Sequence, residues 1–329
     1  MSNSKFLYYF KCFAEWMVPD LFFRMRAKNL FPLETYLNSP EVRARVNYYC
    51  RLPRECDLGG NLRRLSQEHL SKKKTVYYFD SHEISRYFPK HFRWATRFGD
   101  NREIFKTPTV LKSRMIATEE HSFDVLLKLD KVRHFLFVND TLDFKEKKDE
   151  LVFRGLSSQK NRQDFLEKYF GHPRCNVGAA HRSGRKKSKT GAFELSPLSI
   201  EEQLKYKFIL CLEGNDVATS LKWQMSSNSL VIMPKPTCES WFMEGALLAG
   251  THYAEIKSDY SDLDEVMDYY LAHPDQAQEI IRNANNYVEQ FQNEKQERLI
   301  SYLVLKKYFC ATGQLEVSSE ESEFFFGAA

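Results

Sequence analysis

Several patterns that would assign this chain to a common class of protein are missing from its sequence. The seven cysteines, at positions 12, 50, 56, 175, 211, 238 and 310, are odd in number and form no CxxC pair, which argues against a disulfide framework and a zinc site. The nine histidines form no HxxxH or HxH cluster, so we expect them at the surface or in a core rather than on a metal. The sequence therefore predicts reduced thiols and no metal centre.

Membrane and secretion signals are also missing. No apolar run is long enough to span a bilayer. Residues 6–18 are largely apolar, but Lys11 and Glu15 interrupt them and no small-residue cleavage site follows, as it would after a secretory signal. These absences predict a cytoplasmic protein.

The composition predicts a globular chain with two cores. With 329 residues, of which 43% are hydrophobic and 28% charged, the chain is long and apolar enough for two ordinary domains. The net charge of +4 is too small to specify a partner. One basic run, residues 182–189, could bind a polyanion, but it lacks interleaved aromatics, so a solvated loop is the favoured interpretation and nucleic acid is not expected.

An aromatic stripe lies near the start of the chain. Five large apolar residues fall on one face of a helix that ends at Pro19, namely Phe6, Tyr9, Phe10, Phe13 and Met17. Most stripes of this kind belong to a core. The alternative is an interfacial helix whose cations face anionic lipid; these cations are Lys5, Lys11, Arg24, Arg26 and Lys28.

Beyond residue 74, short apolar runs alternate with amphipathic segments, which is typical of α/β proteins. The predicted strands are residues 75–80, 94–98, 109–111, 125–129, 135–138, 151–154, 175–181, 206–212 and 229–233. The predicted helices include residues 40–52, 163–170, 263–271 and 277–291, with a last helix reaching residue 309. Residues 318–329 form an acidic and aromatic tail that is either frayed or a docking element.

Residues 206–253 form the most informative stretch, which predicts strand, turn, helix, strand, helix, strand. Gly214 ends the first strand, and Asn215 or Asp216 can cap a helix that begins at Val217. In a doubly wound α/β domain, ligands bind at the carboxyl ends of the strands. The turn at residues 213–216 lies at such an end.

The chemistry of this turn suits an anion. Gly214 allows close approach of backbone to a ligand, and the N–H groups of a first helical turn at residues 217–220 would favour negative charge. Ser220 adds a hydroxyl and Lys222 a cation. A diphosphate fits this set, but an ordinary capped helix in an α/β core explains the stretch equally well. Neither GxGxxG nor GxxxxGK[ST] is present to decide between them.

Three blocks of the sequence resemble glycosyltransferase family 90, most closely its bacterial lipopolysaccharide branch. LEGNDVATSLKWQMSSNSLVIMPKP, with the following ESWFMEG and HYAEIKSDYSDLDE, resembles the donor-binding half of the family. LVFRGLSSQKNR resembles its FRGxR segment, and FGDNREIFKTPTVLKSR resembles its catalytic segment. The blocks occur in the family's order and lie between residues 76 and 290.

The resemblance implies a GT-B fold, in which two Rossmann-like domains face a cleft. Residues 1–148 would form the acceptor-side domain, residues 149–290 the UDP-sugar domain, and residues 291–329 a C-terminal helix and tail that pack back on the first domain. The implied activity is metal-independent, inverting transfer of a hexose, with glucose or galactose favoured, from a UDP-sugar to a hydroxyl of the lipopolysaccharide core. No cofactor is expected, and the enzyme could contact the inner face of the membrane peripherally.

Two other functions remain open at this point. Within the same class, the chain could be a capsule or protein O-glycosyltransferase. In another class, it could be a polyanion-binding protein that uses residues 182–189.

The resemblance also assigns donor-site residues. Arg154 and Gly155 match the family's FRG, which places Arg154 near the donor phosphates, and Arg162 matches a later basic position. The second arginine of FRGxR is absent, because Ser157 stands there.

The later donor block supplies three further residues. Ser220 matches a family serine, whereas Lys222 replaces an arginine and would act as a point charge without the arginine fork. Glu244 is the candidate acceptor for the ribose hydroxyls.

Asp100 is the predicted general base. It follows a predicted strand and falls in the block that resembles the family's catalytic segment, and a carboxylate at a strand's carboxyl end can take the proton of an acceptor hydroxyl. The alternative is that Asp100 merely turns the chain after Gly99. Asp80, at the end of the 75–80 strand, is the rival base.

One acidic pair has the spacing of a metal-binding DxD motif. Asp262 and Asp264 sit before a well-patterned helix, where acidic residues cap the helix and complement its dipole. Capping is therefore the favoured interpretation, and no metal is expected.

Overall fold

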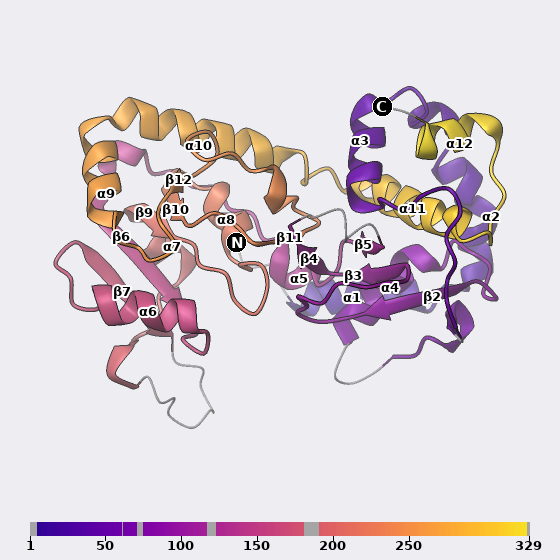
Figure 1. Ribbon diagram of the computed structural model, residues 1–329, viewed down its shortest axis with the longest axis horizontal. Helices are drawn as coiled ribbons and strands as arrows, with labels where there is room; N and C mark the ends of the chain where they lie inside the picture. The colour runs from indigo at the N-terminus through magenta and orange to yellow at the C-terminus, as the bar shows by residue number, and fades with distance from the viewer. Residues whose placement is uncertain (1–4, 61, 71–74, 117–122, 181–190, 328–329) are drawn as a thin grey trace. The chain divides into compact units, whose positions relative to one another are not determined.

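The computed structural model describes residues 5–60, 62–70, 75–116, 123–180 and 191–327. It divides into two compact units (Figure 1). The central unit consists of residues 134–237 and 244–290. The N-terminal unit consists of the chain up to residue 133, residues 238–243 and the chain from residue 291 onward.

The central unit contains a six-stranded parallel sheet in the order β12-β10-β9-β6-β7-β8 (Figure 1). Its strands are β6 (Lys148–Gly155), β7 (Cys175–Ala180), β8 (Glu194–Leu195), β9 (Tyr206–Leu210), β10 (Leu230–Met233) and β12 (Ala254–Glu255). Numbered by their order along the chain, they run 3-2-1-4-5-6, the doubly wound order whose direction reverses between the first and fourth strands. The reversal therefore lies between β6 and β9.

Apolar side chains cover both faces of this sheet, which is why its strands are continuous hydrophobic runs. Leu151, Phe208 and Leu230 belong to a core that includes residues of α6, α9 and α10. Val152 and Ile209 point the other way and pack with Trp223 of α8. The helices of this unit are α6 (Lys160–Tyr169), α7 (Ile200–Gln203), α8 (Leu221–Met225), α9 (Leu263–Ala272) and α10 (Pro274–Glu289).

The N-terminal unit has a smaller sheet in the order β1-β2-β3-β5. Its strands are β1 (Arg63–Arg64), β2 (Arg93–Arg97), β3 (Thr109–Leu111) and β5 (Asp124–Leu126), and the last three are parallel. A second ladder pairs β4 (Ser113–Met115) with β11 (Cys238–Ser240) antiparallel. This ladder joins a segment near residue 240 to the N-terminal part of the chain, and together with the chain from residue 291 onward they build one unit.

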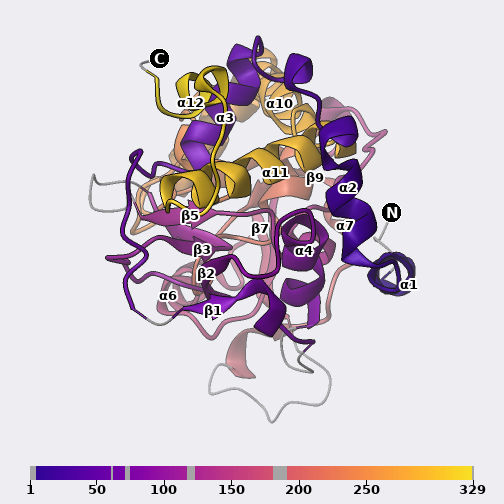
Figure 2. The ribbon, with the colours of Figure 1, turned by 90° about the vertical axis from the view of Figure 1, so that its right-hand side faces the viewer.

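Helices surround this second sheet. They are α1 (Lys5–Trp16), α2 (Asp20–Leu30), α3 (Pro40–Tyr49), α4 (Thr75–Ser85), α5 (Lys131–His134), α11 (Glu294–Ala311) and α12 (Ser319–Phe326), although the last residue of α5 belongs to the central unit. α11 is central: it contacts α3 and α4, and most of its residues from Ile300 to Phe309 are buried (Figure 2). The acidic and aromatic tail is a docking element, because Glu321 of α12 accepts a hydrogen bond from the Tyr36 hydroxyl (2.5 Å) and Phe324 and Phe325 are buried.

The α/β class and most of the predicted strands are present, but four local predictions are wrong. Where residues 206–253 predict a second helix, the chain forms β11 and a three-residue 3-10 turn at Glu244–Ala246 instead. Residues 75–80 belong to the helix α4 rather than to a strand, because Tyr77, Asp80 and Ile84 are buried at helical spacing and this burial outweighs the β-propensity of TVYYFD. Residues 135–138 form no strand. The helix expected from Val217 begins four residues later, as α8.

A buried ion pair holds β11 against β4. Arg114 Nε donates to Glu239 Oε1 at 2.7 Å, and these side chains are 0% and 1% exposed. The remaining guanidinium nitrogens donate to the carbonyl oxygens of Asp124 (2.7 Å) and Tyr48 (2.8 Å). The pair therefore joins β11 to β4 and ties both to α3 and β5.

We predict that Arg114→Met destabilises the N-terminal unit by up to about 3–5 kcal/mol, since it removes the closer of the two arginines paired with the buried Glu239 carboxylate and leaves only the longer contact with Arg51 (3.3 Å). Thermal and urea denaturation would measure the loss. The control is Arg97→Met, which removes an exposed pair with Glu103 (3.5 Å) and should cost less than about 1 kcal/mol. Equal effects of the two substitutions would contradict the importance of the buried pair.

Candidate functional site

The reversal of strand order places predicted donor residues at one edge of the central sheet. Gly155 ends β6, and residues 211–216 follow β9, the neighbouring parallel strand. In doubly wound sheets the crevice for a ligand opens at this point, because the connections on the two sides of the reversal cross opposite faces of the sheet. A side chain at Gly155 would also clash, since a Cβ there would lie 2.7 Å from the Phe153 ring.

The start of α6 anchors the loop that follows β9. Asn161 Nδ2 donates to the Glu213 carbonyl oxygen (3.1 Å), and Gln159 Nε2 donates to Asn215 Oδ1 (3.1 Å). From the other side, the Glu213 carboxylate accepts from the backbone N–H (2.8 Å) and hydroxyl (2.5 Å) of Thr237. Within the loop, the Gly214 N–H donates to the Asp216 carbonyl oxygen (3.0 Å). The predicted residues Gly214, Asn215 and Asp216 thus form one anchored loop.

Arg162 carries a positive charge beside this loop. Its guanidinium donates to the carbonyl oxygens of Leu156 (3.1 Å), Leu212 (2.8 Å) and Glu213 (3.0 Å), and a Cβ on Gly214 would lie 3.5 Å from Nη2. All of these acceptors are neutral, and among the described residues Arg162 forms no ion pair. Its charge is therefore not neutralised by a carboxylate, as a site for an anion requires.

Arg154 points along the sheet toward β7. Its guanidinium donates to the carbonyl oxygen (2.8 Å) and Oδ1 (2.7 Å) of Asn176 and to the carbonyl oxygen of Ser196 (3.1 Å). These acceptors are neutral too, so Arg154 adds positive charge to this end of β6 while it fastens the neighbouring segments together.

Lys222 and Glu244, predicted for separate roles, are paired with each other. Lys222 Nζ donates to Glu244 Oε1 at 2.5 Å, and the two side chains are 0% and 2% exposed. Lys222 lies in α8, and Glu244 begins the 3-10 turn η6 (Glu244–Ala246). Lys222 is therefore a buried counter-ion, because its charge is balanced within the central unit.

The expected anion-binding helix turn at residues 217–220 is absent. α8 begins only after Ser220, which occupies its N-cap position without a side-chain capping hydrogen bond, and the helix has five residues. Val217 and Ala218 are buried apolar residues that hold the preceding loop against the core instead. Helical spacing in the sequence extends across this loop, which is why it predicts an earlier start.

In the N-terminal unit, Asp100 lies just beyond the carboxyl end of β2, as predicted. Gly99 has φ +114°, a conformation that favours glycine and lets the chain turn there. Asp100 is 39% exposed, and its Oδ1 accepts from Lys112 Nζ at 2.7 Å. Lys112 follows β3, the next parallel strand, and is 2% exposed. A buried lysine thus orients a carboxylate that solvent reaches.

Asp130 also follows a parallel strand of this sheet, and the sequence analysis did not identify it as a candidate residue. It follows β5, is fully buried and has φ 56°, which is unusual for a residue other than glycine. Burial raises its pKa to about 6, although the nearby Arg133 and Lys112 act in the opposite direction. In the sequence, Asp130 resembles an ordinary residue at a helix start, and neither its burial nor its backbone angle can be recognised there.

Asp80 is not a strand-end carboxylate. It lies within α4, where its Oδ1 accepts from the Tyr8 hydroxyl (2.6 Å) and its Oδ2 from the Lys131 N–H (3.0 Å). Burial raises the pKa of Asp80. Because the prediction of a rival base depended on a strand that is a helix, its geometric basis is lost.

Asp262 occupies the N-cap position of α9 but makes no side-chain capping hydrogen bond, so the two acidic residues make other contacts. Asp262 Oδ1 accepts from the Lys257 N–H (2.9 Å), and Asp264 pairs with His172 (3.5 Å) and Arg174 (3.8 Å). Over the part of the chain that the structure describes, no three His, Cys, Asp or Glu side chains are grouped so as to hold a metal ion. The basic run at residues 182–189 lies outside the described residues.

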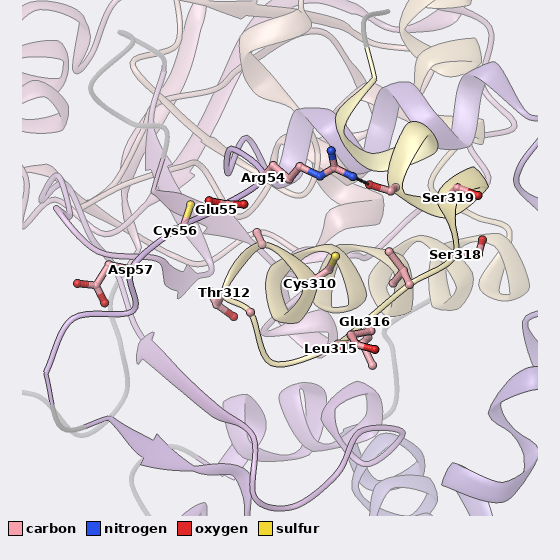
Figure 3. A pocket seen from close by; sticks show the side chains of 14 residues that line it. Arg54, Glu55, Cys56, Asp57, Cys310, Thr312, Leu315, Glu316, Ser318 and Ser319 are labelled. Atoms are coloured by element: carbon pink, nitrogen blue, oxygen red, sulfur yellow. Dashed lines mark hydrogen bonds between the residues drawn. The ribbon is translucent and has the colours of Figure 1, made fainter.

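A pocket of about 640 Å³ lies in the N-terminal unit between residues 54–57 and the turn from α11 to α12 (Figure 3). Arg54 on one side donates to the Ser322 hydroxyl (2.6 Å). Burial raises the pKa of Cys56 to about 11 and also raises that of Cys310, so both thiols stay protonated and are weak nucleophiles at neutral pH. None of the predicted site residues lines this pocket, and we place the candidate site at the sheet edges.

Comparison with known proteins shows extensive similarity. The family model for Glycosyl transferase family 90 matches residues 126–309, more than half of the chain. The chain is 39% identical over 316 residues to the O-glucosyltransferase LpsA of Dichelobacter nodosus, covering 91% of this chain and 97% of that protein. It is also 28% identical over 117 residues to the uncharacterized protein 179R of Invertebrate iridescent virus 6, covering 33% of this chain and 10% of that protein.

We predict that Asp130→Asn stabilises the protein above pH 6. The raised pKa means that the folded state holds its proton while the unfolded state ionises, so stability falls between about pH 4 and pH 6 and stays lower above that range. Asparagine removes this loss, which is worth up to about 3 kcal/mol. Denaturation midpoints of wild type and variant, measured from pH 4 to pH 8, should converge at the acidic end. A constant difference across the range would contradict the prediction.

Proposed function

Because this chain belongs to glycosyltransferase family 90 and is a glycosyltransferase, we propose that it moves a hexose from a UDP-sugar to a hydroxyl of the lipopolysaccharide core. The relative from Dichelobacter nodosus is an O-glucosyltransferase, which favours glucose over galactose as the sugar. The bacterial lipopolysaccharide branch that the sequence blocks resemble supports the acceptor. The GT-B arrangement, with an acceptor-side and a donor-side domain, is part of this proposal.

The observation that carries the proposal is Arg162 beside Gly214 at the strand reversal. A nucleoside diphosphate needs positive charge and a close approach of backbone. Arg162 supplies the charge and Gly214 of the anchored loop the approach, where doubly wound sheets bind ligands. We propose that Arg162 binds the diphosphate of the leaving nucleotide and that Arg154 provides a second positive charge there. Glu244 stays the candidate for the ribose hydroxyls, oriented by its ion pair with Lys222.

We propose an inverting mechanism with Asp100 as general base. In a single displacement, one group takes the proton of the acceptor hydroxyl while the nucleotide leaves from the opposite face of the sugar. Asp100 suits this role because its carboxylate is exposed and the buried Lys112 ammonium holds it in position. Charge that develops on the leaving diphosphate would be stabilised by the fixed cations of the central unit.

The remaining parts of the proposal concern metal, location and alternatives. We propose that no metal takes part, because Arg154 and Arg162 can neutralise a diphosphate.

In the described residues, no helix combines the length and hydropathy needed to cross a bilayer. We propose a cytoplasmic location from the relationship to the bacterial enzyme. Capsule or protein glycosylation is the second candidate, and no observation on the described residues favours a polyanion-binding function for residues 182–189.

We predict that the protein releases UDP when it is incubated with UDP-glucose and a truncated core oligosaccharide, and less from other UDP-sugars. Asp100→Asn should lower transfer by about 10²- to 10⁴-fold, because it keeps the shape and removes the proton acceptor, while UDP-sugar binding and the melting temperature stay near wild type. Glu103→Gln, an exposed acid on the same segment, is the matched control. Normal transfer by Asp100→Asn would exclude it as the base.

We predict that Arg162→Gln weakens UDP binding by about tenfold or more, the value of one charge-assisted contact. Arg174→Gln is the control, since the charge of Arg174 is already balanced by Asp268 at 2.8 Å, and it should leave binding unchanged. Lys222→Met should lower the melting temperature more than Arg162→Gln does, because it leaves Glu244 buried without this partner. Titration calorimetry and thermal denaturation separate the two effects. Unchanged UDP affinity in Arg162→Gln would remove it from the donor site.

We predict that transfer survives EDTA, since protein cations rather than a divalent ion neutralise the diphosphate. The measurement is UDP release before and after chelation, with added manganese as a control. Activity lost in EDTA and restored by manganese would return Asp262 and Asp264 to consideration as metal ligands.

A further inference from the structure

The apolar stripe near the start of the chain faces solvent rather than a core. No residue of α1 is buried, contrary to the more common expectation for such a stripe. Ten large apolar side chains of α1, α2 and the turn between them are at least 40% exposed, namely Phe6, Leu7, Phe10, Phe13, Trp16, Met17, Leu21, Phe22, Met25 and Leu30. Soluble monomers rarely expose so many neighbouring apolar side chains unless the surface binds something.

Polar contacts hold this orientation. The Tyr8 hydroxyl donates to Asp80 Oδ1 (2.6 Å), and Trp16 Nε1 donates to the Tyr78 hydroxyl (3.1 Å), which fastens α1 to α4 (Figure 2). Arg86 Nη2 donates to the carbonyl oxygens of Glu15 (2.8 Å) and Val18 (2.7 Å) at the end of α1. The Tyr8 hydroxyl and Trp16 Nε1 therefore bond to α4. These bonds hold α1 in an orientation that leaves its apolar side chains exposed to solvent.

The charge on these two helices is mainly positive. Residues 5–30 contain five cations, Lys5, Lys11, Arg24, Arg26 and Lys28, and two carboxylates, Glu15 and Asp20. Asp20 is already paired with Lys90 (3.1 Å) and His82 (3.3 Å). Aromatic and aliphatic side chains flanked by lysine and arginine are the composition of helices that lie in the interface of anionic membranes.

We propose that α1 and α2 dock this protein on the surface of an anionic phospholipid bilayer. The two helices have 12 and 11 residues, too few to span a bilayer, so they lie in the headgroup region with the exposed apolar side chains directed toward the acyl chains. A second copy of the chain is a poorer occupant, because a symmetric contact of this face would bring its cations against the same cations. The proposal goes beyond the transfer reaction and does not depend on the identity of the sugar or acceptor.

Vesicle binding of the full-length protein tests the proposal. We expect co-sedimentation with vesicles of equal parts phosphatidylcholine and phosphatidylglycerol, and weaker binding to pure phosphatidylcholine or at high salt, which screens the lysines and arginines. The double substitution Phe10→Ser with Met25→Ser should weaken binding by about tenfold or more, since both side chains leave water when the helix docks. Leu248→Ser, which removes a 60% exposed leucine of the central unit, is the matched control and should bind as wild type.

Tryptophan fluorescence provides a second readout without any loss of apolar surface. Of the four tryptophans, Trp16 is exposed, whereas Trp94, Trp223 and Trp241 are buried. Lipids brominated on their acyl chains should therefore quench wild type and should not quench Trp16→Phe.

Three results would overturn the proposal. The first is that wild type does not bind the anionic vesicles. The second is that the Phe10→Ser, Met25→Ser protein binds them as tightly as wild type. The third is that the wild type forms dimers without lipid, that the double substitution dissociates them, and that vesicles do not bind; the face would then be an interface between copies. Because no sugar or acceptor is present, failure of the transfer assay would leave this test unaffected.

Discussion

The buried ion pair between Arg114 and Glu239 is the constraint on which much of this structure depends. Both side chains are withdrawn from water, and each balances the charge of the other there, with Arg51 as a second partner of Glu239 (3.3 Å). The pair holds residues 238–243, which follow β10 of the central unit in the sequence, in the N-terminal unit. It also fixes β4 directly after Lys112, the lysine that orients Asp100. The position of the proposed base therefore depends on an interaction made by a distant part of the chain.

The two units present their candidate groups in the same way and differ in how charge is balanced. In each, parallel strands end at a common edge, and short loops at that edge carry the polar residues. In the central unit, Arg154 and Arg162 bond to neutral carbonyl and amide oxygens and keep their positive charge. In the N-terminal unit, Asp100 is held by Lys112 and the buried Asp130 has a raised pKa. One edge suits an anion, and the other suits proton transfer.

Two features of the N-terminal unit lower its stability. Asp130 combines burial with an unfavourable backbone angle, and α1 exposes aromatic side chains that a stable core would bury. Buried charges are paired at several places in the chain, as in Asp130 with Arg133 (3.1 Å), Arg45 with Glu297 (2.6 Å) and Lys147 with Asp140 (2.7 Å). We interpret the exposed face of α1 as a functional feature, because the proposed membrane contact would remove its apolar side chains from water.

The sequence by itself determined the α/β class, the strands β6, β9 and β10 and the helices α9, α10 and α11, because buried runs and helical periodicity depend on residues within a few positions of one another. It also determined Asp100 beyond a strand end and the turn at Gly214, since glycine and aspartate end strands by local chemistry. Only the tertiary structure decided that residues 75–80 are helical, that α1 faces outward, and that Lys222 is a counter-ion. These outcomes depend on partners 22 residues apart for Lys222 and Glu244, and 72 for Tyr8 and Asp80. No local pattern encodes such pairings, because they form only once the fold brings the partners together.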